Sequence, residues 1–174
     1  AATATTRDST QVICIAPPMT PIGSSSLQIY IDGFDIARHM SHFVYYNNPS
    51  VTEVLPTFLH ESGGLTMTVR GFNFQKTDSI FCRFGDTQVS RATWFAEGLL
   101  ECIAPANRPG LSTVDVSLNG VDYTDNQIQV TYVTESVVTS MTPKHGGAGG
   151  GTVIYVVGNN FLSASVLPRT IASA

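Results

Sequence analysis

The fold of this 174-residue chain is decided by the stretch Ser62-Gly63-Gly64-Leu65-Thr66-Met67-Thr68-Val69-Arg70-Gly71-Phe72-Asn73-Phe74, because the chain contains it twice. The second copy reads Gly150-Gly151-Thr152-Val153-Ile154-Tyr155-Val156-Val157-Gly158-Asn159-Asn160-Phe161, and Gly151 follows Gly64 by 87 residues. Each copy has a glycine pair, an apolar run, a second glycine and a phenylalanine. We interpret the glycines as backbone devices, a turn into a strand and a bend out of it. A spacing that recurs indicates a repeated structural unit.

Other blocks follow nearly the same spacing. The block Cys14–Pro17 matches Cys102–Pro105 at a shift of 88 residues. Beyond these blocks the shift decreases by one residue to 87. At this shift Gly23 matches Gly110, Asp35 matches Asp122, Tyr45 matches Tyr132 and Pro56 matches Pro143. The positions of the matching blocks predict the C-terminal part of a first unit at 1–46, a complete unit at 47–133 and the N-terminal part of a third unit at 134–174. We therefore expect the chain to be a piece of a longer array.

Strand periodicity dominates the complete unit. Apolar residues alternate with polar ones in three runs, and the apolar sets predict one buried face each: Leu65, Met67 and Val69; Val114, Val116 and Leu118; Ile128, Val130 and Tyr132. Asn119-Gly120 adds a hairpin signal. About seven short strands in roughly 87 residues are typical of an immunoglobulin-sized sandwich of two sheets. The fold class is all-β.

Composition argues against a nucleic-acid partner and against a transmembrane helix. Apolar residues make up 43% of the chain and charged residues 13%, with nine Lys and Arg and a formal charge of −4. This balance argues against a surface that binds nucleic acid. The longest apolar runs, Val12–Ala16 and Val153–Val157, are far shorter than the roughly 20 residues of a transmembrane helix. No secretory signal is visible at the N-terminus.

The complete unit resembles the IPT/TIG domain, the immunoglobulin-like module that plexins, other cell-surface receptors and some transcription factors share. The resemblance covers about residues 12–161 and depends on the order of short pieces: Pro56, Gly63–Thr66, Gly71–Phe74, Phe81–Gly85, Leu100–Pro105, Gly110, Val114–Ser117, Asn119-Gly120 and Val130–Tyr132. It implies tandem immunoglobulin-like (early-set) β-sandwiches and a role in binding, without chemistry. One departure stands out: Arg169 occupies the position 87 residues after Cys82, and the pattern of the third unit is lost after Phe161.

The resemblance also implies a structural disulfide between Cys82 and Cys102. A bridge that closes a loop of about 20 residues stabilises a fold by roughly 3 kcal/mol in the chain-entropy model. It favours a secreted or cell-surface setting. The residues alone also allow two buried free thiols. Cys14 matches Cys102, so its own partner would precede Ala1.

Two patterns that suggest catalysis lack what catalysis requires. The glycine-rich run 146–152 has no Lys before Thr152 and precedes a strand, whereas a phosphate-binding loop follows one. His60, Glu61 and Ser62 are adjacent on one loop, so they cannot converge as a nucleophile, a base and an orienting group. We expect no enzyme activity and no cofactor.

Four carboxylates are weak candidates for calcium ligands. They lie on corresponding hairpins, at Asp32, Asp35, Asp122 and Asp125. Calcium takes six to eight oxygen ligands, and two side chains per hairpin suffice only if a neighbouring unit contributes others. Turn chemistry explains Asp beside Gly equally well. Calcium at the joints between units is therefore an alternative hypothesis.

These features favour a non-catalytic structural or adhesive array, extracellular or on the cell surface, that acts through protein contacts. The partner would be another protein, a second copy or a neighbouring unit of the same chain, bound by edge strands and hairpin tips. Two alternatives stay open: an accessory module of a secreted carbohydrate-active enzyme, and a DNA-associated module of the Rel type.

Overall fold

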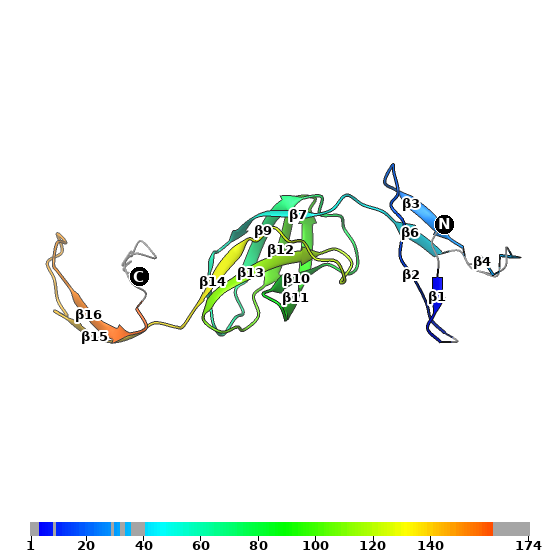
Figure 1. Ribbon diagram of the computed structural model, residues 1–174. Coiled ribbons are helices and arrows are strands. Elements are labelled where there is room, and N and C mark those ends of the chain that lie inside the picture. Colours follow the sequence, from blue (N-terminus) through cyan, green and yellow to red (C-terminus); the bar gives the residue numbers. More distant parts are fainter. Residues whose placement is uncertain (1–3, 9, 29, 32–33, 36–40, 162–174) are drawn as a thin grey trace. The chain divides into compact units, whose positions relative to one another are not determined.

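The computed structural model describes residues 4–8, 10–28, 30–31, 34–35 and 41–161, and these form β-strands without a helix (Figure 1). The chain divides into two compact regions, Ala1–Asn48 and Pro49–Ala174. The complete sandwich lies in the second of these regions and contains eight strands: β7 (Ser50–Leu55), β8 (Phe58–His60), β9 (Thr66–Phe72), β10 (Phe81–Phe84), β11 (Gln88–Ala96), β12 (Leu99–Ile103), β13 (Gly110–Ser117) and β14 (Gln129–Val133). The all-β prediction is confirmed.

The eight strands pair in the order β7-β9-β12-β11-β10-β13-β14-β8. Neighbours are antiparallel except β14 and β8. Strand β11 belongs to both layers, since Gln88–Arg91 pair with β10 and Ala92–Ala96 pair with β12. The two ends of the order, β7 and β8, are separated only by Pro56 and Thr57. The sheet therefore curls into a sandwich that β11 connects on one side and the β7–β8 segment on the other (Figure 1).

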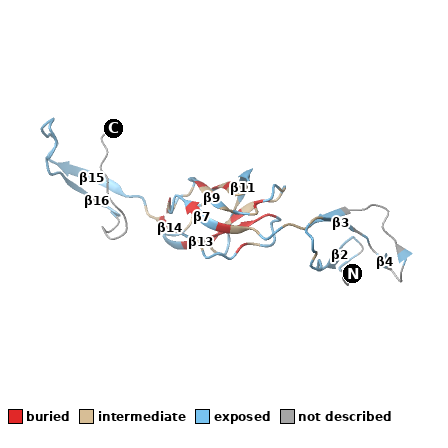
Figure 2. Ribbon diagram, turned by 90° about the horizontal axis from the view of Figure 1, so that it is seen from above, coloured by how far each residue is buried: buried red, intermediate tan, exposed pale blue. Residues whose placement is uncertain are grey.

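The core forms from the residues that face inward along each strand. Figure 2 shows the buried residues concentrated within this sandwich. The buried apolar side chains include Val51, Val54, Leu59, Met67, Val69, Phe74, Cys82, Phe84, Leu100, Cys102, Val114, Val116, Leu118, Val130 and Tyr132. The predicted inner faces are thus largely correct. Two residues depart from the prediction: Ile128 is half-buried, and Leu65 is 41% exposed because it precedes β9 and the pleated alternation starts only at Thr66.

The glycines of the repeated stretch have two different roles. Gly63 and Gly64 have left-handed φ angles of 68° and 86°, which glycine adopts without steric penalty, so they form the predicted turn before β9. Gly71 lies inside β9 and its φ is outside the left-handed region. A Cβ there would collide with the carbonyl oxygen of Ser50 on β7 and lie 2.6 Å from Cζ of Phe74. Gly71 lies one residue before the end of β9 and allows two strands to approach closely.

The remaining strands form pairs whose registers repeat those of the sandwich. Strands β15 (Val137–Thr142) and β16 (Tyr155–Asn159) pair at positions 87 residues after the β7–β9 pairs, with the same register shift along the ladder. Strands β1 (Ala4–Thr6) and β2 (Val12–Cys14) pair at positions 88 residues before β11–β12. Strands β3 (Ser24–Leu27) and β6 (Ser41–Val44) pair 87 residues before positions of β13–β14, and β4 (Tyr30–Ile31) pairs with β5 (Phe34–Asp35).

Candidate interaction surface

A disulfide joins Cys82 on β10 to Cys102 on β12, with 6.3 Å between the Cα atoms. It is the pair that the family resemblance implied. Both residues are buried, and each points into the core from a different layer, since β10 pairs with β13 whereas β12 pairs with β9. The bond therefore ties the two layers together through the interior. Cys14 is an exposed free thiol.

Two of the carboxylates proposed as calcium ligands, Asp122 and Asp125, lie in the segment between β13 and β14. Oδ2 of Asp122 accepts a hydrogen bond of 2.8 Å from the amide of Asn119, and Asp125 accepts one from the amide of Gln127. Both bonds join side chains within the same loop. Asp35 lies on β5, and Asp32 lies outside the described residues. Within the described ranges, no three His, Cys, Asp or Glu side chains gather as a metal-binding group.

An ion pair on the β10–β13 layer, with a buried carboxylate and a half-buried guanidinium, was not predicted from the sequence. Nη2 of Arg83 lies 3.0 Å from Oδ2 of Asp115, its register partner, and Asp115 is only 5% exposed. The guanidinium lies 4.3 Å from the ring centroid of Tyr123. Thr124 is buried nearby, and its hydroxyl accepts a hydrogen bond from the Val116 N–H. The segment between β13 and β14 thus covers this part of the layer's outer surface.

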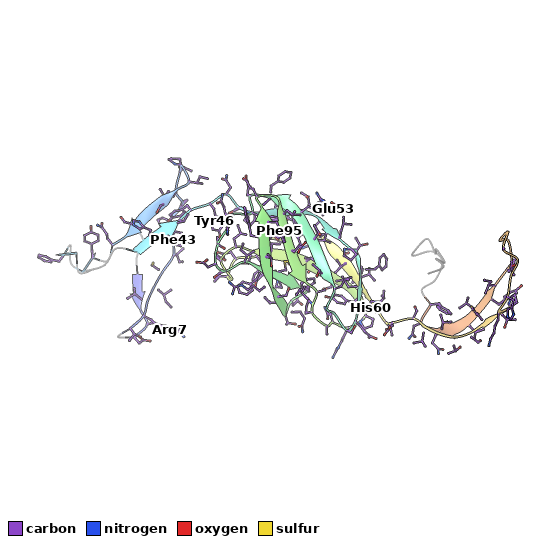
Figure 3. All side chains as sticks on the ribbon, turned by 180° about the vertical axis from the view of Figure 1, so that it is seen from behind. Arg7, Phe43, Tyr46, Glu53, His60 and Phe95 are labelled. Atoms are coloured by element: carbon purple, nitrogen blue, oxygen red, sulfur yellow. A yellow bond between two sulfur atoms is a disulfide. The ribbon has the colours of Figure 1, made fainter. Side chains whose placement is uncertain are left out.

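The outer face of the opposite layer, β7-β9-β12-β11, carries a salt bridge among exposed apolar side chains. Nε of Arg70 on β9 lies 3.5 Å from Oε2 of Glu53 on β7. Leu99 is the register partner of Arg70 on the other side. Glu53 and Phe95, both labelled in Figure 3, lie on the two strands that border this layer. The face is therefore mixed, with the salt bridge directly beside Leu99.

Two exposed phenylalanines lie at one end of this face. Phe72 is 63% exposed and Phe95 is 52% exposed. The end of β9 runs beside the β11–β12 turn, because the N–H of Gly71 donates to the carbonyl of Gly98 and the N–H of Phe74 to that of Glu97. Phe95 lies where the register of β11 shifts, between Trp94 and Ala96. We call Phe72, Phe95 and Leu99 the aromatic end.

Trp94, next to Phe95, has a structural position. Its indole N–H donates to the carbonyl of Phe74, which is fully buried. The ammonium of Lys76 lies 5.8 Å from the centroid of the indole ring. Trp94 is thus fixed against the core while its neighbour points to solvent.

The internal repeat distinguishes positions that the fold requires from those that it does not. Inward positions stay apolar in the repeat: Val51 corresponds to Val138, Val54 to Met141, Val69 to Val156 and Leu100 to Val12. The exposed phenylalanines do not recur, since Asn159 occupies the position of Phe72 and Arg7 that of Phe95. The fold therefore does not require aromatic residues at these two sites. They are candidates for contact with a partner.

The sequence model of the IPT/TIG domain matches residues 49–132, which contain all eight strands of the sandwich except Val133, the last residue of β14. This part of the chain belongs to the IPT/TIG domain family. The predicted resemblance is thereby confirmed. In the described residues of this IPT/TIG-containing chain, no helix has the length and apolarity needed to cross a lipid bilayer.

The curated relatives of this chain are large proteins. Fibrocystin-L of Homo sapiens is 25% identical over 162 residues, covering 88% of this chain and 4% of that protein. Fibrocystin of Canis lupus familiaris is 27% identical over 165 residues, covering 91% and 4%. Plexin-A2 of Mus musculus is 26% identical over 117 residues, covering 63% and 6%. The chain therefore spans only a small part of these relatives.

The solved structure of the full extracellular region of plexin A4 has a similar fold. It aligns with a TM-score of 0.53 and 16% identity, and covers 76% of this chain and 12% of that one. At this identity the likeness supports the IPT/TIG fold and nothing more specific.

Proposed function

We propose that this chain belongs to a tandem array of IPT/TIG sandwiches that acts outside the cell as a non-catalytic module and binds another protein through the aromatic end. The observation that carries the proposal is the exposure of Phe72 and Phe95, at positions where the repeat has Asn159 and Arg7. Exposed aromatic residues that the fold does not need are typical of protein interfaces.

The repeated registers support the array. Three strand pairs outside the complete unit, β1–β2, β3–β6 and β15–β16, lie 87 or 88 residues from corresponding pairs inside it. The β4–β5 pair is not among them. The arrangement fits the C-terminal part of a unit at 1–46, a complete unit at 47–133 and the N-terminal part of another at 134–174. The left-handed φ angles recur at the same spacing, with Asn73 at 61° and Asn160 at 59°.

Two observations support an extracellular location. The Cys82–Cys102 disulfide is of a kind that persists in oxidising compartments. The structure with a similar fold is the extracellular region of plexin A4. The calcium hypothesis for Asp122 and Asp125 stays secondary, because their observed bonds are to neighbouring amides.

The composition of the face indicates the partner's chemistry. The aromatic end offers two phenyl rings and Leu99, beside the Glu53–Arg70 salt bridge. A complementary protein surface would bury the rings against aliphatic or aromatic side chains and place polar groups at the rim. The chain's charge of −4 disfavours a polyanionic partner such as DNA.

The test compares two variants by surface plasmon resonance against a panel of purified ectodomains from the source organism. We expect at least one ectodomain to bind the full chain, and the double variant Phe72→Ser/Phe95→Ser to weaken that binding at least tenfold. The control is Leu111→Ser, which removes a side chain that is 73% exposed on the other layer. Equal binding by the double variant, or no binding partner in the panel, would refute the proposal.

A further inference from the structure

The charges around the aromatic end do not balance. The outer face of the β7-β9-β12-β11 layer carries Glu53 and Glu101, and the β11–β12 turn adds the exposed Glu97. The salt bridge of Arg70 goes to Glu53, and the ammonium of Lys76 lies against the indole ring described above. In the described part of the chain, neither Glu97 nor Glu101 forms an ion pair. Two carboxylates without a counter-charge therefore lie on or beside this face.

Both carboxylates lie close to the aromatic end in the strand order. Glu97 follows Phe95 by two residues, in the turn whose backbone bonds to the end of β9. Glu101 follows Leu99 by two residues on β12. Residues two apart on a strand lie about 7 Å from each other and project from the same face. A partner side chain that covers the aromatic end is thus within reach of a carboxylate.

The other units do not repeat these charges. The positions that correspond to Glu53, Arg70, Glu97 and Glu101 hold uncharged residues: Ser140, Val157, Ser9 and Ile13. The strand pair still forms without them, since Ser140 pairs with Val157 in the register of Glu53 and Arg70. The fold therefore requires these charges as little as it requires the two exposed phenylalanines.

The complete unit already holds one arginine with a carboxylate and an aromatic ring. Nη2 of Arg83 lies 3.0 Å from Oδ2 of Asp115, and the guanidinium lies 4.3 Å from the ring centroid of Tyr123. The carboxylate supplies a charge-assisted hydrogen bond and the ring supplies a cation–π contact. The aromatic end presents the same two groups to solvent, while the guanidinium of Arg70 on that face is held by Glu53.

We infer that the partner bound at the aromatic end presents an arginine, which an exposed ring and a free carboxylate receive together. Its guanidinium stacks on the phenyl ring of Phe95 and pairs with Glu97, and Glu101 adds a second negative charge nearby. Arginine fits better than lysine because its planar group can stack on a ring and bond a carboxylate at the same time. The chain's charge of −4 attracts a basic surface over a longer range. The inference rests on the proposed function, since it names the chemistry of the partner at the same surface.

The first test uses a phage library of random twelve-residue peptides as the probe against the immobilised full chain. Peptides that also bind the Phe72→Ser/Phe95→Ser chain are removed. Among the remaining peptides we expect arginine at three times its frequency in the unselected library, or more. Enrichment of acidic or uncharged peptides, or the absence of any peptide that requires the two phenylalanines, overturns the inference.

A double-mutant cycle then tests the contact itself. The selected peptide is synthesised as found and with each arginine replaced in turn by glutamine, and fluorescence polarisation measures its affinity for the unmodified chain and for Glu97→Gln/Glu101→Gln. We expect the two substitutions in the chain to weaken binding of the arginine peptide about fivefold and to leave one glutamine peptide unaffected. Equal weakening for all peptides overturns the inference.

The matched control is Asp86→Asn, which removes an exposed carboxylate from the β10–β11 turn, at the opposite end of β11 from Glu97. It should change the affinity of the arginine peptide less than twofold. A loss as large as that of Glu97→Gln/Glu101→Gln would show that only the overall charge matters, and would overturn the assignment to the aromatic end.

The inference and the proposed function fail in different ways. If an ectodomain binds through Phe72 and Phe95 and Glu97→Gln/Glu101→Gln leaves that binding unchanged, the arginine inference is wrong and the proposed function stands. If no ectodomain in the panel binds, the proposed function is refuted, whereas the peptide cycle still decides whether this surface prefers arginine.

Discussion

Replacing Gly71 by alanine should destabilise the complete sandwich through a steric clash between β7 and β9. The φ of Gly71 is outside the left-handed region, so alanine introduces no backbone strain there. Its Cβ would collide with the carbonyl oxygen of Ser50 and lie 2.6 Å from Cζ of the fully buried Phe74, where ordinary contact begins near 3.4 Å. The ring must move by about 0.8 Å and β7 must separate from β9. Overpacking of this kind costs about 3 kcal/mol of unfolding free energy, the upper end of the usual range.

The assay is urea unfolding followed by tryptophan fluorescence. Trp94 is the only tryptophan, so the signal reports on the complete sandwich and not on the strand pairs outside it. Gly64→Ala is the control: the φ of Gly64 is 86° and nothing lies within 4 Å of its added Cβ. It should lose only about 1–2 kcal/mol, the penalty of left-handed backbone. A loss at Gly71 that is no larger than the loss at Gly64, with unchanged urea dependence, would refute the steric argument.

Three further outcomes are expected from the same unfolding measurement. Asp115→Ala leaves the guanidinium of Arg83 without its carboxylate and should lower the unfolding free energy by about 2 kcal/mol, less than the loss of a fully buried pair because Arg83 is a third exposed. The double variant Arg83→Met/Asp115→Leu should regain most of this stability. A double variant as unstable as Asp115→Ala would contradict the prediction. Burial raises the pKa of Tyr132 to about 12, so the folded state keeps the phenol neutral. The unfolding free energy should be unchanged below about pH 10, where the phenol of the unfolded chain is also neutral, and should fall as the pH rises toward 12. Tyr132→Phe should remove that fall. Replacing both Cys82 and Cys102 by alanine should cost about 3 kcal/mol, and alkylation of the native chain should label Cys14 alone; labelling of all three without reductant would show that the disulfide does not form.

The sequence was sufficient to predict the features that depend on local pattern. Alternation along β9 and β13 identified the inner faces, since each side chain's direction follows from its neighbours in a strand. The glycine pair was correctly assigned to a turn. The side chain of Leu65 was misassigned because it precedes the first residue of β9. The close contact of Gly71 with Ser50 could not be predicted because Ser50 lies on another strand.

The features that depend on register between distant strands could not be predicted. Arg83 and Asp115 are 32 residues apart, and only the β10–β13 pairing makes them direct partners. The sequence shows each as an outward charge on its own strand. The passage of β11 between the two layers is equally hidden, since nothing in residues 88–96 marks the point where its partner changes from β10 to β12.

The internal repeat separates structural from functional positions because one chain presents the same fold position more than once. Where the side chain faces inward, both copies are apolar, as with Val69 and Val156, since the core requires it whatever the unit binds. Where it faces outward, the copies diverge, and Phe72 against Asn159 is the largest change from apolar to polar on β9 and β16. An exposed aromatic residue lowers solubility and adds nothing to the core, so its presence in one unit alone needs a reason outside the fold. The proposed contact with a partner supplies such a reason, and it applies to the complete unit specifically.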